Sequence, residues 1–267
     1  MQLINEKSKE MEVHHHPDLH HKKKNLKEYF LEFLMIFLAV TLGFFAENLR
    51  EHFKNSDEIN SDMQSMIADL QSDVTMFNAD VAVNQLSDRR TDTLISILKL
   101  NRSNTSHIYF LARFITANNS IYTPDSRTFD QMKSSGTLKL IESRSILDSI
   151  SNYYQSLQFF ISQSDLQREK VDDVHSVNSE LFDGYTFQHM FAAMNSNGNI
   201  NSGLDVNILQ PENNPPLLSN DFNAINKVII AYHYLYATTE INNNVAMFTR
   251  QGAQRLIDVL KKEYHLK

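Results

Sequence analysis

Hydrophobic and polar positions change their pattern several times along the chain, and the first tract is the most apolar. From Tyr29 to Ala46 the only charged residue is Glu32, and from Phe33 to Ala46 the only polar side chain is Thr41. A helix of this length is roughly 27 Å long, about the thickness of a bilayer's hydrocarbon core. A soluble amphipathic helix would repeat a polar face every three or four residues. The pattern therefore predicts a transmembrane helix over residues 26–48.

A cleaved signal peptide is the alternative for this tract. Its apolar region is normally shorter and its cleavage site has two spaced small residues, whereas this tract ends in "GFFAEN". Basic residues favour one orientation, because cytoplasmic flanks carry the excess of lysine and arginine. Lysines precede the tract, and the basic residues after it alternate with Glu47 and Glu51. We expect a protein of the bacterial inner membrane, with residues 1–25 cytoplasmic and residues 49–267 periplasmic.

A heptad pattern follows the apolar tract. Its hydrophobic positions are spaced 4-3-4-3-4, which is typical of a coiled-coil seam: Met63, Ile67, Leu70, Val74, Phe77 and Val81. The seam either packs against later helices of the chain or mediates self-association. Ser56 and Asn60 weaken it, and "SDMQ" at 61–64 resembles a capping box. We therefore expect one helix over about 26–100 that is either continuous or broken near 55–61.

The same seven-residue count begins at Glu32 and passes through Ala39 and Ala46. Gly43 lies four residues after Ala39, and small residues at this spacing let helices approach closely in lipid. Glu32 lies one turn inside the basic edge. It either extends to the head groups or pairs with a nearby residue, or it contacts a partner subunit or conducts protons. We treat these four residues as candidates for association within the membrane.

The rest of the chain predicts an all-α protein. Gly and Pro are scarce, with 6 and 5 copies, which favours long helices over many short strands. "HIYFLARFITA" is too short to be a second membrane span. We expect short helices at 107–117 and up to Gly136, long helices at 143–182 and 221–264, and a flexible loop at 195–220. The predicted architecture is one N-terminal transmembrane helix that continues into an elongated extracytoplasmic helical bundle or coiled coil.

Two blocks resemble a known family. They are "KNLKEYFLEFLMIFLAVTLGFFAENLREH", preceded by "MEVHHHPDLHHKKK", and "RTFDQMKSSGTLKLIESRSILDSISNYY". The chain resembles, over about residues 11–55 and 120–160, an uncharacterised family of small single-pass membrane proteins of Bacteroidota-type bacteria. The resemblance implies a His- and Lys-rich lead, one N-terminal span and an extracytoplasmic helical region. It implies no activity.

Candidate chemistry is sparse. The chain has no cysteine and a net charge of −7, so it lacks thiol chemistry and the basic surface of a nucleic-acid-binding protein. Asp172, His175 and Ser179 share a helix face, a combination more typical of a solvated surface than of a catalytic triad. One cluster has the character of metal ligands, although a weakly basic tail explains it equally simply: His14, His15, His16, His20 and His21.

These patterns favour a non-enzymatic protein without a cofactor. We expect it to be a membrane-anchored structural or accessory subunit that contacts the lipid bilayer and either a second copy of itself or another membrane protein. The alternative function is a periplasmic helical bundle that senses a ligand. This alternative is weakened by the short cytoplasmic segment, which leaves little room for a signalling output.

Overall fold

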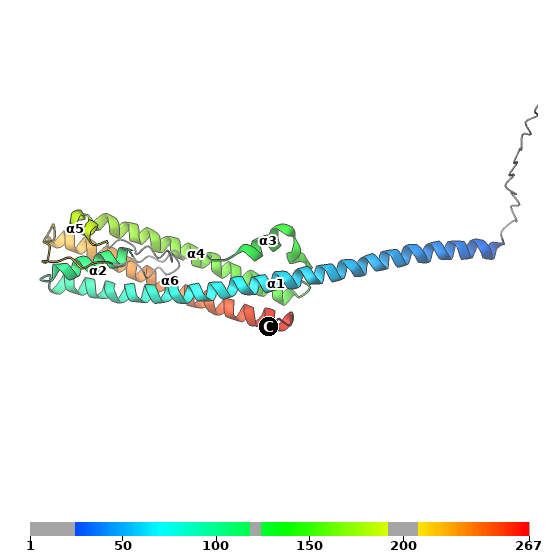
Figure 1. Ribbon diagram of the computed structural model, residues 1–267. Helices are drawn as coiled ribbons and strands as arrows, with labels where there is room; N and C mark the ends of the chain where they lie inside the picture. Colours follow the sequence, from blue (N-terminus) through cyan, green and yellow to red (C-terminus); the bar gives the residue numbers. More distant parts are fainter. Residues whose placement is uncertain (1–24, 118–123, 192–207, 267) are drawn as a thin grey trace, which may run out of the picture. The chain divides into compact units, whose positions relative to one another are not determined.

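The computed structural model describes residues 25–117, 124–191 and 208–266, and this part of the chain is all-α, as predicted. It contains six α-helices and one 3₁₀-helix (Figure 1). The elements are α1 (Leu26–Leu100), α2 (Thr105–Ala117), α3 (Arg127–Ser135), η1 (Thr137–Leu140), α4 (Arg144–Asn178), α5 (Gly184–His189) and α6 (Phe222–Glu263).

The first helix is continuous. α1 has 75 residues and passes through residues 55–61 without a break. The predicted capping box is not used, because residues 61–64 lie inside the continuous helix and no helix begins there. Of the two alternatives for this segment, the uninterrupted helix is confirmed.

The chain divides into two compact units, Met1–Lys54 and Asn55–Lys267. In the first unit the structure describes the beginning of α1 alone, and nearly all its side chains are exposed. In the second unit the rest of α1 belongs to a bundle with the later helices. This second unit contains both hydrophobic cores of the described residues.

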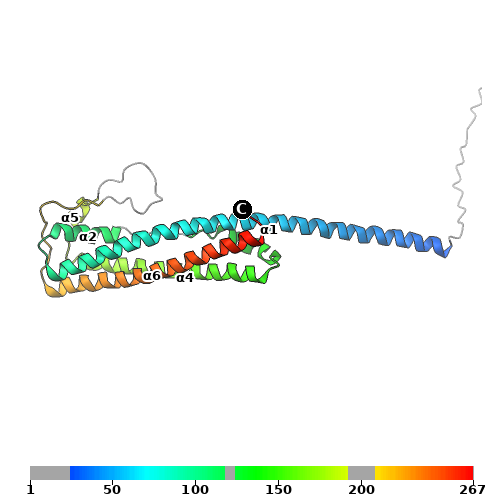
Figure 2. The same ribbon diagram turned by 90° about the horizontal axis from the view of Figure 1, so that it is seen from below.

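Three long helices build the bundle, and their directions follow from contacts between them (Figure 2). α4 packs along α6 and runs antiparallel to it. α1 runs in the direction of α4. The defining contacts are the hydrogen bonds Gln167–Asn242 and Asn178–Tyr232 between α4 and α6, and Asn78–Arg250 and Asp88–Asn243 between α1 and α6.

Helix ends agree with the local sequence. Gly136 follows α3 in the left-handed conformation, with φ 84°, as predicted for a glycine cap. Asp221 caps α6 by accepting from the backbone N–H groups of Asn223 and Ala224. α4 ends at Asn178, four residues before the predicted end at 182, in a turn that leads to α5. α5 and η1 were not predicted, because elements this short carry no measurable periodicity.

The core of the bundle has two separate hydrophobic clusters. One joins residues 59–77 of α1 with residues 146–160 of α4 and 246–260 of α6. The other joins the end of α1 with α2, the end of α4 and the beginning of α6. On each long helix a polar stretch separates the two clusters. Burial of α2 in the second cluster explains its apolar sequence, with Arg113 half-buried over the Phe191 ring at 4.4 Å from its centroid.

Candidate functional sites

The first candidate is the apolar surface at the beginning of α1. This is the one helix in the described part of the chain that is long and apolar enough to cross a membrane. Its aromatic and aliphatic side chains face solvent, and Phe33, Met35 and Phe44 are each about two-thirds exposed. Burial in a protein core therefore does not explain this surface. The observations fit a membrane anchor or a signal sequence.

The predicted intramembrane residues lie on this surface. Glu32, Ala39, Gly43 and Ala46 are all exposed. A Cβ atom built on Gly43 meets nothing within 4 Å, so the space around the glycine is open. The role of these four residues in association between helices stays a prediction. The predicted histidine ligands at 14–16, 20 and 21 lie outside the described residues.

The predicted seam is part of the bundle's own core. Met63, Ile67, Leu70 and Phe77 are buried in the first hydrophobic cluster, and Val74 and Val81 are partly buried against it. Of the two interpretations of the heptad pattern, packing within the chain is the arrangement seen for these side chains.

The centre of the seam includes polar residues that the sequence reasoning missed. Twelve of the sixteen buried positions of α1 form a stripe that alternates by four and three residues over its whole packed length: 59, 63, 66, 70, 73, 77, 80, 84, 87, 91, 94 and 98. This stripe shares Met63, Leu70 and Phe77 with the prediction. It takes Asp73 and Asp80, both almost fully buried, in place of the neighbouring valines.

We define the polar layer as a group of buried polar side chains between the two hydrophobic clusters, together with the half-buried Gln167. Gln167 of α4 connects the three helices within it, because its amide nitrogen donates to Asn84 on α1 and its oxygen accepts from Asn242 on α6. Such links specify helix register, since a shifted register would leave buried polar groups unpaired. The layer comprises Asp80, Asn84, Ser87, Asp88 and Thr91 of α1, Gln167 of α4, and Thr239, Asn242 and Asn243 of α6.

Asp88 is the electrostatic centre of the polar layer. Its side chain is 6% exposed and accepts a hydrogen bond from Asn243 at 3.2 Å. The pKa of Asp88 is raised to about 7, mainly by burial and in addition by the neighbouring carboxyl groups of Glu240 and Asp92. The group therefore exchanges its proton near neutral pH.

The polar layer contains unused hydrogen-bonding capacity. The Ser87 hydroxyl oxygen and the side-chain oxygens of Asn242 and Asn243 are buried without a hydrogen-bond partner. Ser87 lines a cavity of about 10 Å³ together with Asp88, which is room for about one water molecule. The cavity is too small for an organic substrate, so we interpret the layer as a structural and titrating element.

Two further aspartates of α1 hold the segment that leads into α3. Asp73 accepts from the backbone N–H of Asp125 at 2.9 Å and from the Tyr153 hydroxyl at 2.5 Å. Asp69 accepts from the backbone N–H of Thr128 at 3.1 Å. These buried carboxylates therefore serve as local capping and docking groups, which explains why the core stripe tolerates them.

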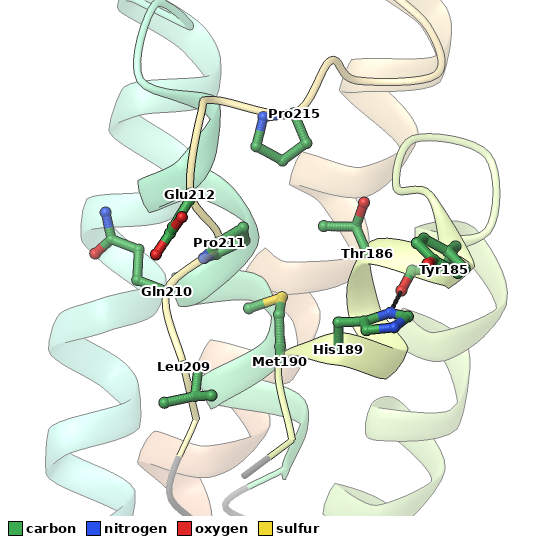
Figure 3. Close-up of a pocket in the computed structure, with 9 residues that line it drawn as sticks. All are labelled: Tyr185, Thr186, His189, Met190, Leu209, Gln210, Pro211, Glu212 and Pro215. Atoms are coloured by element: carbon green, nitrogen blue, oxygen red, sulfur yellow. Dashed lines mark hydrogen bonds between the residues drawn. The ribbon is translucent and has the colours of Figure 1, made fainter.

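A surface groove forms the second candidate site (Figure 3). It lies between α5 and the extended segment after residue 208, and its volume is about 340 Å³. His189 is placed by a 2.8 Å hydrogen bond between its Nδ1 and the backbone oxygen of Tyr185. The lining is mixed aromatic, apolar and polar: Tyr185, Thr186, His189, Met190, Leu209, Gln210, Pro211, Glu212 and Pro215.

The shared helix face of Asp172, His175 and Ser179 does not form a triad. The three residues are exposed, and the nearest His175–Asp172 approach is 3.8 Å. The Ser179 hydroxyl donates to the backbone oxygen of Ser176 at 2.6 Å. This arrangement is that of a solvated surface.

Comparison of the chain with protein-family models, curated proteins and solved structures found no match. The findings support a helical protein with one long apolar helix near the N-terminus. The resemblance of two blocks to single-pass membrane proteins stays a prediction.

Proposed function

We propose that this protein is a membrane-anchored, non-enzymatic helical protein that acts as a structural or accessory subunit through protein–protein contacts. The observation that carries the proposal is the exposed apolar surface of α1 between Tyr29 and Ala46. This surface continues, within one uninterrupted helix, into the part of α1 that builds the bundle. A bilayer would cover the surface, and the bundle would be available to partners.

The orientation belongs to the same proposal. Basic residues before the span favour an N-terminus in the cytoplasm and a bundle in the periplasm. Because the chain has no native cysteine, single cysteines report topology without background. In cells with a permeabilised outer membrane, a membrane-impermeant maleimide should label Asn213→Cys and leave Ser8→Cys unlabelled. Labelling of Ser8→Cys alone would indicate the opposite orientation and contradict this part of the proposal.

Anchoring is tested by one charge in the span. Phe37→Arg places a cation near the span's centre, at an apparent insertion cost of roughly 3 kcal/mol. The matched control is Phe53→Arg, beyond the span, where the native phenylalanine is 65% exposed against 53% for Phe37. We expect Phe37→Arg to lower the carbonate-resistant membrane fraction and Phe53→Arg to leave it unchanged. Equal fractions for both variants would contradict an anchor at this segment.

The accessory role is tested by purification from native membranes in mild detergent. A protein that reproducibly accompanies the full-length chain, or a stable multimer of the chain itself, supports it. A full-length chain that is monomeric and accompanied by no other protein under these conditions would contradict it.

The groove supports a second candidate, a ligand-sensing bundle. Its volume of about 340 Å³ lies within the range of small-molecule sites, about 300–1,000 Å³. A compound that raises the melting temperature of the full-length protein and not that of Tyr185→Ser would support this candidate. A broad screen in which no compound shifts the melting temperature would count against it.

A further inference from the structure

α6 has a second apolar stripe, beside its buried face. Its exposed members are Ile230 (46%), Tyr234 (61%), Ile241 (53%) and Phe248 (61%). Ala237 and Val245, both half-buried, continue the row between them. The spacings are three or four residues throughout, which places the six side chains on one face of a helix. We call these six residues the outer stripe.

α4 contributes apolar side chains at the same levels of the bundle. Gly252 lies 3.8 Å from the Tyr153 ring, and Asn242 bonds to Gln167, so the two helices run side by side between these contacts. Phe159 and Leu166 lie within this interval on α4 and are 55% and 39% exposed. They match, in level along the antiparallel pair, the part of α6 that carries Ile241 and Phe248.

The apolar area that these side chains expose is large enough for a protein–protein interface. An aromatic side chain presents about 150–250 Å² when free, so each exposed aromatic contributes on the order of 100 Å². The outer stripe with the two α4 residues then exposes on the order of 500–600 Å², the size of the largest patches on ordinary monomers. When such a patch is covered on two molecules, about 1,000 Å² or more of accessible surface is removed from solvent. This area reaches the lower range of specific interfaces.

The charge distribution favours a second copy as the occupant. The chain carries a net charge of −7, so two copies repel each other unless they meet through an uncharged face. In a two-fold interface the same patch supplies both surfaces, and a charged residue near the axis would face its own copy. Every position of the outer stripe is apolar, and aromatic residues such as Tyr234 and Phe248 are typical of interface centres.

We propose that the outer stripe of α6, with Phe159 and Leu166 of α4, is the surface through which two copies of this chain associate. The inference rests on the proposed function, because anchoring in one bilayer raises the effective concentration of the copies. It assigns the contact to α6 and leaves the heptad seam of α1 to the bundle core.

The test measures the mass of the full-length protein in detergent by light scattering after size exclusion. We expect a dimer for the wild type. Ile241→Lys and Phe248→Glu each place a charge within the outer stripe, and their dimer dissociation constants should rise at least about tenfold. Phe222→Glu is the matched control, because Phe222 is also an exposed phenylalanine of α6, at 77%, and lies outside the outer stripe. It should remain a dimer.

Cross-linking in native membranes tests the same surface without detergent. Single cysteines at Ala237, Ile241, Val245 and Phe248 should give at least one strong disulfide-linked dimer on mild oxidation. The same substitution at Phe222 should give none. Circular dichroism of each charge variant should match the wild type, since exposed positions carry little of the folding energy.

Several outcomes overturn the inference. A monomeric wild type does so, as does a dimer that survives both charge variants or dissociates equally in Phe222→Glu. A monomer that still sits in the membrane and retains a different partner would refute the self-association surface and leave the proposed function standing. A dimer that is absent from the membrane fraction would refute the anchor and retain the surface.

Discussion

Replacement of Asp88 by asparagine should stabilise the bundle at neutral and alkaline pH. Above its pKa of about 7, Asp88 is a buried anion close to the carboxyl groups of Glu240 and Asp92. Asparagine has nearly the same shape and no charge. Its side-chain oxygen accepts the hydrogen bond that Asn243 donates to Asp88 at 3.2 Å, and its amide group donates to Glu240.

The direction in which the free energy of unfolding changes with pH follows from the protons that Asp88 binds in the folded and unfolded chain. The pKa of Asp88 rises from 3.8 in the unfolded chain to about 7 in the folded one, so between these values the folded protein binds more protons. The free energy of unfolding contributed by this group is therefore highest below pH 4, falls as the pH rises toward 7, and is lowest above it. A shift of about three units corresponds to roughly 4 kcal/mol.

The free energy of unfolding of Asp88→Asn should equal that of the wild type at pH 4 and exceed it by about 2–4 kcal/mol at pH 8. The lower value allows for relaxation of the protein around the anion. For a domain of this size, each kcal/mol changes the melting temperature by about 2–4 °C. Thermal unfolding of the full-length protein, followed by circular dichroism from pH 4 to 8, measures the difference at each pH. Other titrating groups cancel in this difference.

Asp92→Asn is the control, because Asp92 lies on the same helix and is exposed. Its effect should be much smaller and only weakly dependent on pH. An advantage of Asp88→Asn that is the same at pH 4 and pH 8 would refute the reasoning. A loss of stability at pH 8 would show that the charged form of Asp88 is favoured by contacts stronger than its desolvation.

Three further substitutions test local features by thermal unfolding. Tyr153→Phe removes the hydrogen bond to the Asp73 carboxylate and should cost about 1.5–3 kcal/mol; an unchanged melting temperature would mean that another donor replaces the hydroxyl. Gly136→Ala should cost about 1–2 kcal/mol from its positive φ alone, since its Cβ meets nothing within 4 Å, and Gly136→Asn should cost less. Asp221→Ala should cost about 1 kcal/mol by removing the cap of α6, whereas Asp221→Asn should be nearly neutral; equal losses for both would contradict the capping role.

The heptad of α1 shows why the sequence predicted only some of the residues of the buried seam. Hydrophobic spacing selected Val74 and Val81, and both lie at the edge of the core. The buried stripe includes Asp73 and Asp80 instead. A strict count of four and three through Met66, Leu70, Phe77, Leu94 and Leu98 would have crossed these polar positions. Hydrophobicity alone rejects an aspartate there, because its burial is favourable only when a distant donor such as the Tyr153 hydroxyl is present.

The sequence by itself determined the local features: the all-α class, the apolar tract, the glycine end of α3 and the approximate limits of the long helices. These depend on interactions within a few residues, namely periodicity, helix propensity and capping. Only the tertiary structure decided that the seam of α1 packs within its own chain, that a polar layer divides the core, and that an apolar stripe on α6 stays uncovered. Each of these depends on which faces of distant segments meet, and a single helix pattern carries no information about its partner.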